Sequence, residues 1–199
     1  MNRTFILCIA ILAPLCVGCF NQKSTATRQR WMDIKAATDN LKDSAAIISQ
    51  AKFDGVQPQG ESELIEPMAQ GTAMVEACKT FHSALTAQKS VNVDPKLNEI
   101  AQKLVTASES LLAQTQRGQE VFIKAKAIEA EIKSGTNPFA IPQLTLEAGR
   151  LMQEMNSAMQ MGNQVLVQMN ACYQELEALR PELNEKYKLE LPEIKWVGQ

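Results

Sequence analysis

Four long stretches of the chain repeat apolar residues at alternating steps of three and four positions, which is the spacing of one helical face. No segment of strand length competes with this pattern by alternating apolar and polar residues. The repeats predict helices at about residues 25–53, 62–89, 95–133 and 144–180. Because the stripes have the spacing of antiparallel coiled-coil seams, we expect an all-α fold: an elongated up-down-up-down bundle of four helices with coiled-coil-like packing.

Residues that start helices support these boundaries. Ser24 or Thr25 is expected to cap the first helix through its side-chain oxygen. The pair Asp94-Pro95 is expected to open the third helix, because a short polar cap followed by proline is a common helix start.

The fourth helix is expected to kink or stop at Pro181, since proline lacks the N–H that a helix interior requires. The helical bundle therefore covers residues 25–181. Residues 182–199 form a charged and partly irregular tail, which we expect to fold back onto the bundle through Trp196.

The start of the chain has the layout of a secretory signal. Arg3 supplies a positive charge, and an almost wholly apolar run follows from Phe5 to Leu15. That run is shorter than the roughly 20 residues that a membrane-spanning helix needs. A charged start, a short apolar region and a small residue before a cleavage point predict that residues 1–18 are a signal peptide.

The signal ends in Val17-Gly18-Cys19, which resembles the lipobox of bacterial lipoproteins, where a small residue precedes an invariant cysteine. The family favours leucine three positions before that cysteine, and this chain has Cys16 there. The resemblance implies that Cys19 becomes the mature N-terminus, with a diacylglycerol on its thiol and a fatty acid such as palmitate on its amine. Several acyl chains give stable anchoring. The alternatives are an ordinary secretory signal with an incidental cysteine, and an uncleaved transmembrane anchor.

The lipobox resemblance also implies a location, on the extracytoplasmic side of a cell membrane. Residues 19–24 would then be the lipidated cysteine and a short tether. In lipoproteins of enteric bacteria, an aspartate after the cysteine signals retention in the inner membrane. Phe20 therefore favours the periplasmic face of the outer membrane, in an envelope that has two membranes.

Charge and motifs narrow the range of functions. Removing the signal takes Arg3 from the 20 basic residues and leaves 19 against 22 acidic ones, a side-chain charge of −3. No basic cluster stands out, so nucleic-acid binding has no support. The sequence has no glycine-rich phosphate loop, GxSxG or HExxH motif, and a single histidine limits the prospects for a catalytic triad. We therefore predict a non-enzymatic protein without a cofactor.

Two cysteines, Cys78 and Cys172, are left once Cys19 is assigned to lipid. An even pair in an exported domain suggests a disulfide. Two buried free thiols, or a role in metal binding, are the alternatives.

The expected helix ends allow the heights of the two cysteines along the bundle to be compared. Pairing Lys89 with Pro95 across one loop, and Lys133 with Leu144 across the next, places both cysteines level with about residue 105 of the third helix. The second and fourth helices are diagonal in a square bundle, so a bridge needs a flattened or three-plus-one arrangement.

Sulfur and imidazole side chains recur every four residues on the second helix, at Met74, Cys78 and His82. Such soft ligands in an exported protein suggest Cu(I), and a histidine with a methionine can also hold haem. The alternative is ordinary core packing, because methionine on a helical stripe usually fills space.

Small residues inside the helices form a further group, at similar predicted heights. These residues are Gly71, Gln114, Gly118 and Gly162. Glycine in a helix interior costs roughly 1 kcal/mol relative to alanine. The group therefore predicts either close approach of the helices or a small cavity.

The third and fourth helices are longer than the first two, at roughly 58 and 55 Å against about 43 Å. Their connection should project as a hairpin, beyond Phe122 on one helix and before Met155 on the other. An uncovered apolar patch of this kind marks an interaction site. The predicted surface is Phe122, Ile128, Ile132, Phe139, Ile141, Leu144 and Leu146, with Leu151 and Met152 beside them. The alternative is that these side chains pack on each other.

The first helix begins at the end of the bundle opposite this hairpin, so an anchor at Cys19 would point the hairpin away from the membrane. These features together predict a membrane-anchored lipoprotein that acts as a helical scaffold or protein-interaction module of the cell envelope. A protein partner or a second copy would bind at the hairpin. The alternative is a carrier of a small ligand, Cu(I) or haem that uses Met74, Cys78 and His82.

Overall fold

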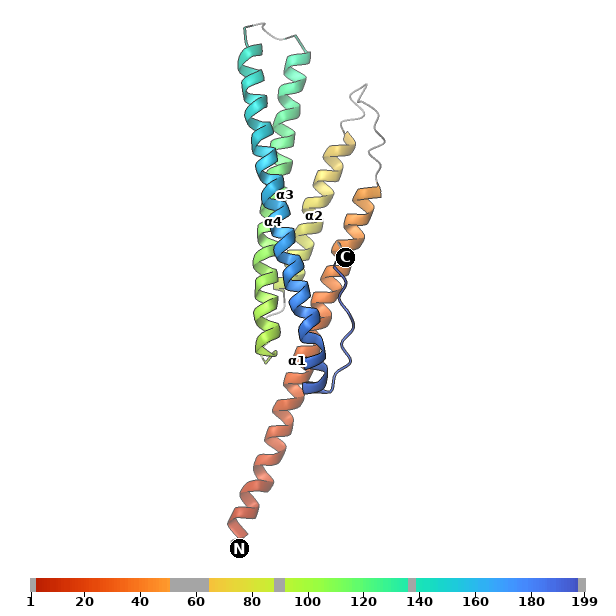
Figure 1. Cartoon of the computed structure of the whole chain (residues 1–199), viewed down its shortest axis with the longest axis vertical. Helices are drawn as coiled ribbons and strands as arrows, with labels where there is room; N and C mark the ends of the chain where they lie inside the picture. Colours follow the sequence, from red (N-terminus) through yellow and green to blue (C-terminus); the bar gives the residue numbers. More distant parts are fainter. Residues whose placement is uncertain (1–2, 51–64, 88–91, 136–138, 197–199) are drawn as a thin grey trace.

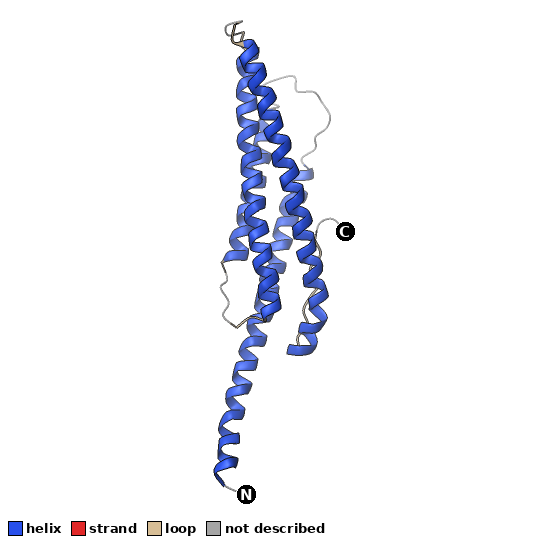
Figure 2. Cartoon of the chain, turned by 60° about the vertical axis from the view of Figure 1, so that its left-hand side comes forward, coloured by secondary structure: helices blue, strands red, loops and turns tan. Residues whose placement is uncertain are grey.

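Four antiparallel helices make up the computed structural model, which describes residues 3–50, 65–87, 92–135 and 139–196 (Figure 1). Side chains of residues 3–21, 47–50 and 65–69 are outside this description. The helices are α1 (Arg3–Gln50), α2 (Ile65–Thr86), α3 (Pro95–Lys133) and α4 (Ile141–Tyr187). Consecutive helices pack together in alternating directions, and the described residues form only helices and loops (Figure 2). The predicted all-α helical bundle is therefore confirmed.

Helix α1 is longer than predicted, because it begins at Arg3 instead of near residue 25. The expected cap at Ser24 or Thr25 is therefore wrong. Residues 19–50 contain neither glycine nor proline, so nothing local interrupts the helix there. The hydroxyl of Ser24 instead donates to the backbone carbonyl of Tyr187 (3.3 Å).

Helix α3 starts and ends where the sequence predicts. The side chain of Asp94 caps it by accepting a hydrogen bond from the backbone N–H of Lys96 at 3.0 Å, and Pro95 is its first residue. The helix ends at Lys133, and Gly135 then takes up a left-handed conformation at φ 70°.

Helix α4 continues through Pro181 to Tyr187, so the predicted end near residue 180 is wrong and the tail starts at Lys188. Pro181 leaves the carbonyl four residues earlier without its helical donor. Packing beyond the proline offsets that loss, since Leu183 and Tyr187 are buried and Tyr187 bonds to Asp94. Lys188 then ends the helix in the left-handed region, at φ 53°.

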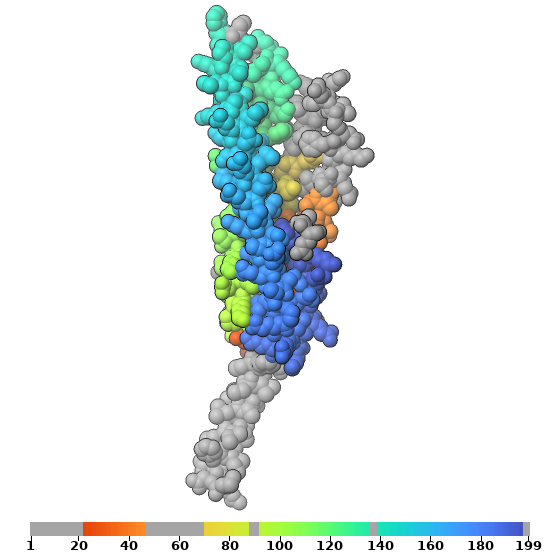
Figure 3. All heavy atoms as spheres, viewed as in Figure 1, coloured from red at the N-terminus to blue at the C-terminus, as the bar shows by residue number. Residues whose placement is uncertain are grey.

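The C-terminal tail returns along α1 and α4, which confirms the predicted fold-back (Figures 1 and 3). Trp196 is buried and stacks on Tyr173 of α4, with ring centroids 4.6 Å apart. The indole N–H of Trp31 donates to the carbonyl oxygen of Pro192 at 2.8 Å. The tail therefore fills the space between α1 and α4.

The core is divided into two clusters along the bundle. The larger one joins all four helices and the tail at the N-terminal end of α3, around Trp31, Phe81, Leu97, Met169 and Leu183. The smaller one lies within the α3–α4 hairpin and consists of Val121, Ile128 and Leu151, with partly buried neighbours. This hairpin rises above the described parts of α1 and α2 in the space-filling view (Figure 3), as the helix lengths predict.

Contacts between helices show how they are aligned in height. Ion pairs of Lys96 with Glu182 (2.8 Å) and Lys103 with Glu175 (2.9 Å) join α3 to α4. Because the two helices are antiparallel, residues at the same level have numbers with a constant sum, and both pairs add to 278. The predicted pairing of Lys133 with Leu144 adds to 277, so this alignment is confirmed within a residue.

The alignment of α2 with α3 differs from the prediction. His82 contacts Ser108 (2.9 Å) and Cys78 contacts Thr115 (3.7 Å), so the residue numbers add to 190 and 193. The predicted pairing of residues 89 and 95 adds to 184. The reason is that the end of α2 lies roughly ten residues, or about 15 Å, above the level at which α3 starts.

Candidate interaction surfaces

The N-terminal part of α1 extends beyond the other helices, at the end of the molecule opposite the α3–α4 hairpin (Figure 1). Cys19 lies on this helical backbone, so the segment predicted as a tether, residues 19–24, is helical. Ser24 already bonds to the α4 backbone. About 7.5 Å of helix thus separates Cys19 from the bundle. Lipidation of Cys19 stays a prediction.

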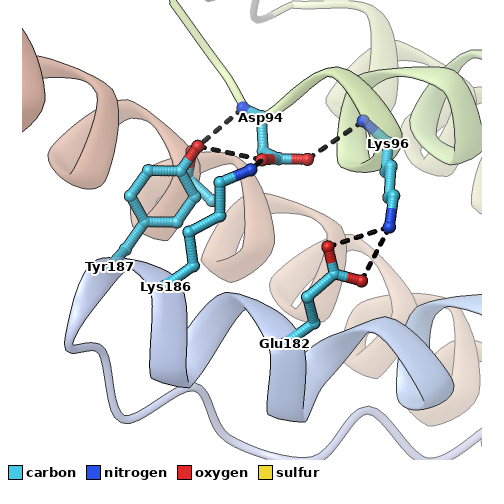
Figure 4. Close-up of polar contacts among 6 residues, drawn as sticks. Asp94, Lys96, Glu182, Lys186 and Tyr187 are labelled. Carbon is cyan, nitrogen blue, oxygen red and sulfur yellow. Dashed lines mark hydrogen bonds and ion pairs between the residues drawn. The ribbon is translucent and has the colours of Figure 1, made fainter.

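A polar cluster closes the bundle at this end (Figure 4). One carboxylate oxygen of the buried Asp94 accepts hydrogen bonds from Lys186 Nζ (2.8 Å) and from the hydroxyl of Tyr187 (2.9 Å). The backbone N–H of Asp94 donates to Thr27 Oγ1 on α1 (3.0 Å). Lys96 forms an ion pair with Glu182 beside the cluster. These bonds connect α1, α3 and α4.

The charge of Asp94 is stabilised by its donors. Burial alone would raise the pKa of the Asp94 carboxyl, but hydrogen bonds from Lys186, Tyr187 and the backbone of Lys96 outweigh it and lower that pKa. Asp94 is therefore a carboxylate at neutral pH. With each bond satisfied inside the protein, the cluster is a structural clamp.

At the other end of the molecule, the predicted interaction surface divides into two groups. Ile128 is buried, while Ile132 and Leu144 are partly buried against the small hairpin cluster. Their placement on an exposed surface is therefore wrong, because the two helices of the hairpin bury these residues between themselves. Phe122 is half-buried beneath Lys126, whose ammonium group lies 5.8 Å from the ring centroid.

Of the remaining predicted residues, Leu151 is buried in the small hairpin cluster and the others are exposed. Phe139 is 88% exposed and Leu146 is 78% exposed, and Ile141 is also exposed near the tip of the hairpin. Leu146 precedes Met152 by six residues, which places these two side chains about a third of a turn apart around α4. The exposed apolar residues therefore do not form one continuous patch.

Sequence reasoning did not identify Met159 and Leu166, which are exposed on α4 like Met152. These three residues recur every seven positions, so they follow a single line along the helix. That spacing is visible in the sequence. The spacing alone does not single out these residues, because the same helix carries a more complete apolar stripe one position away, through Leu151 and Ala158.

The glycines inside α3 and α4 line a shallow hollow that is open to the surface, and they do not mark a close approach of these two helices. A Cβ added to Gly118 or Gly162 would meet nothing within 4 Å. The hollow has a volume of about 250 Å³ and is lined by Gln114, Thr115, Gly118, Ala158, Met159 and Gly162. Gly71 is on α2, where an added Cβ would lie 3.7 Å from Gln119.

Cys78 and Cys172 are buried free thiols, so the predicted disulfide is wrong. Cys78 lies against Thr115 of α3, whereas the α3–α4 alignment places Cys172 level with about position 106. Nine residues of helix correspond to about 13 Å, and a disulfide needs Cα atoms within about 7 Å. Burial raises the pKa of both thiols.

Two residues of the predicted metal or haem site, Cys78 and His82, contact α3. His82 Nδ1 lies 2.9 Å from Ser108 Oγ, and Cys78 Sγ lies 3.7 Å from Thr115 Oγ1. These hydroxyls are seven residues apart, so the two side chains are directed to different turns of α3. Met74 is half-buried on the same helix. Binding of Cu(I) or haem by these residues stays a prediction.

Comparison with known proteins gives no relative from which a function could be transferred. No protein-family model matches the chain, and no curated protein or solved structure matches it significantly. Over the residues that the structure describes, no helix is long and apolar enough to cross a membrane. Within the same residues, no group of three or more His, Cys, Asp or Glu side chains gathers as metal ligands do.

Proposed function

We propose that this protein is a lipoprotein anchored through Cys19 on the extracytoplasmic side of a cell membrane, where it acts as a non-enzymatic helical interaction module. The observation that carries the proposal is the arrangement of its two ends. The N-terminal part of α1, which contains Cys19, lies at one end of the molecule, and the α3–α4 hairpin lies at the other (Figure 1).

This arrangement suits a protein that presents a binding surface away from a bilayer. The helical link from Cys19 to Ser24 is short, so the bundle would lie close to the membrane and the hairpin tip far from it. Phe139 and Leu146 expose large apolar side chains near that tip. Exposed apolar residues at the distal end support contact with another protein. In an envelope with two membranes, Phe20 favours the outer one.

Acylation is tested by metabolic labelling with an alkyne analogue of palmitate in a bacterial host. We expect the full chain to be labelled and to sediment with membranes, and Cys19→Ser to lose the label. The matched control is Cys78→Ser, which removes a thiol outside the lipobox and should keep the label. Equal labelling of Cys19→Ser and the unchanged chain would show that the anchor assignment is wrong.

Contact at the distal end is tested separately by chemical crosslinking in native membranes. The double substitution Phe139→Asp with Leu146→Asp should abolish crosslinked complexes that the unchanged chain forms. Gln153→Asp, on an exposed polar position of the same helix, is the control and should leave them unchanged. If the double variant gives the same complexes as the unchanged chain, the hairpin tip is not the contact.

A further inference from the structure

One face of α4 is covered in its C-terminal half and open in its N-terminal half. Met152 is 68% exposed and Met159 is 60% exposed, with Leu166 seven residues further along. Tyr173 comes after another seven residues and is only 2% exposed. Trp196 stacks on Tyr173, and Thr38 of α1 bonds to its hydroxyl at 2.7 Å. The open face therefore continues a surface that α1 and the tail already cover.

Helix α1 ends below the level of Met152 and Met159, which leaves this part of the α4 face open. Contacts of Thr38 with Tyr173 and of Ser24 with Tyr187 each join residues whose numbers add to 211. Gln50, the last residue of α1, is therefore level with about position 161 of α4. From Ile141 to that position, roughly 20 residues or 30 Å of α4 extend beyond α1.

This projecting length carries no charge on the open face. Its charged residues are Glu147, Arg150 and Glu154, and at 100° per residue all three lie on the other sides of the helix from Met152. The exposed residues of the open face are Ile141, Thr145, Met152, Asn156 and Met159, while Ala148 and Met155 beside them pack against the small hairpin cluster. An uncharged, methionine-rich face of this length is suited to packing against another helix.

The hollow formed by Gly118 and Gly162 lies at the lower end of the same face, next to the level at which α1 ends. Met159 lines both the hollow and the open face. The open face therefore has the hollow at one end and, 21 residues away, an exposed branched side chain, Ile141, at the other.

We propose that the projecting hairpin is a self-association surface, on which the hairpin of a second copy lies antiparallel, each Ile141 entering the other copy's Gly118–Gly162 hollow. Pairing Ile141 with Gly162 makes paired residue numbers add to 303. Met152 then lies at the two-fold axis. The same surface is used by both copies, as a two-fold interface requires.

The lengths favour a second copy in this orientation. The distance from Ile141 to the hollow equals the length of α4 that extends beyond α1, so each hairpin tip would stop near the level at which the other copy's α1 ends. A parallel pair would bring the two α1 helices into collision. In the antiparallel pair the two N-terminal segments point in opposite directions.

Disulfide trapping of the full chain tests the position of the axis. In Met152→Cys the introduced thiols of two copies would be adjacent, so mild oxidation should link most chains into dimers on a non-reducing gel. The matched control is Gln153→Cys, at the same height on another face, which should link at least tenfold less. The unchanged chain corrects for its own five cysteines. Equal linking at both positions would overturn the proposal.

Sedimentation of the purified full chain in detergent tests the association itself. We expect a dimer whose Kd rises at least tenfold in Met152→Glu, because two carboxylates would meet at the axis. Gly162→Leu, which fills the hollow, should weaken the dimer to a similar extent, while Gln153→Glu leaves it unchanged. Helicity from circular dichroism confirms that each variant is folded. The proposal is contradicted if the unchanged chain is monomeric, or if Met152→Glu leaves the Kd of the dimer unchanged. Either result counts against it whether or not Cys19 is acylated.

Discussion

Trp196 stacks on Tyr173 with ring centroids 4.6 Å apart and ring planes inclined by 12°. The hydroxyl of Tyr173 lies 2.7 Å from Thr38 Oγ1, and burial raises the pKa of this tyrosine, so it remains a hydrogen-bonding phenol at neutral pH. Tail, α4 and α1 therefore meet at one side chain. This contact closes the bundle where α1 and α4 do not pack closely by themselves.

Removing the indole should destabilise the whole bundle. Trp196→Ala leaves a cavity between α1 and α4 and exposes Tyr173, and we expect the free energy of unfolding to fall by about 3 kcal/mol. Urea unfolding followed by circular dichroism measures this change. Lys195→Ala, at an exposed neighbouring position, should change it by less than about 0.5 kcal/mol. A similar loss in both variants would show that the tail contributes through general contacts and not through the stacked ring.

The clamp at Asp94 should be sensitive to the loss of its carboxylate. Asp94→Ala removes the cap of α3 and leaves the buried hydroxyl of Tyr187 without its acceptor. A lost cap costs about 1 kcal/mol and a buried hydroxyl that loses its acceptor about 1–3 kcal/mol, so we expect a loss of about 2–4 kcal/mol. Asp94→Asn keeps an acceptor oxygen and should lose less. Equal stability of Asp94→Ala and the unchanged chain in urea unfolding would contradict this role.

The same carboxylate should make stability depend on pH. Because folding lowers the pKa of Asp94, its stabilising contribution is complete above the unfolded pKa of about 3.9 and is lost as pH falls through the lower folded value. The stability difference between the unchanged chain and Asp94→Asn should therefore be constant from pH 7 to about 5 and shrink below about 4. Urea unfolding at a series of pH values measures it, and a difference that grows in acid would have the wrong sign.

Local signals in the sequence predict the parts of this fold that depend on local chemistry. Asp94-Pro95 opens α3 because a cap and a proline need only their own turn. Pro181 fails as a helix end because the burial of Leu183 and Tyr187 outweighs one lost hydrogen bond. Local preference predicts the start of α3, whereas tertiary contacts decide the end of α4.

The relative heights of the helices and the exposure of their side chains are likewise predictable only where local sequence decides them. The α3–α4 alignment is predictable because the connection between these helices is short. The α2–α3 alignment is not, because α2 ends well above the start of α3, where Asp94 is held by Thr27 from the distant α1. Exposure of Met159 depends in turn on where α1 ends, which no local pattern around Met159 can reveal.

Both buried cysteines should react only when the bundle unfolds. Since Cys78 and Cys172 are free thiols of raised pKa, N-ethylmaleimide should label neither in the folded chain, and both in urea without any reductant. Mass spectrometry of the peptides that contain them gives the extent of labelling. If labelling in urea requires a reductant, the two residues are bonded and the height difference between them is wrong.

Filling the glycine positions with a single methyl group should stabilise the bundle. A Cβ at Gly118 or Gly162 meets no atom within 4 Å, so alanine there brings its helix preference without a clash. We expect Gly118→Ala and Gly162→Ala each to raise the free energy of unfolding by about 0.5–1 kcal/mol in urea. Gly135→Ala is the control of opposite sign, since Gly135 has φ 70° and alanine would be strained there. Destabilisation by Gly162→Ala would mean that the hollow is smaller than its volume indicates.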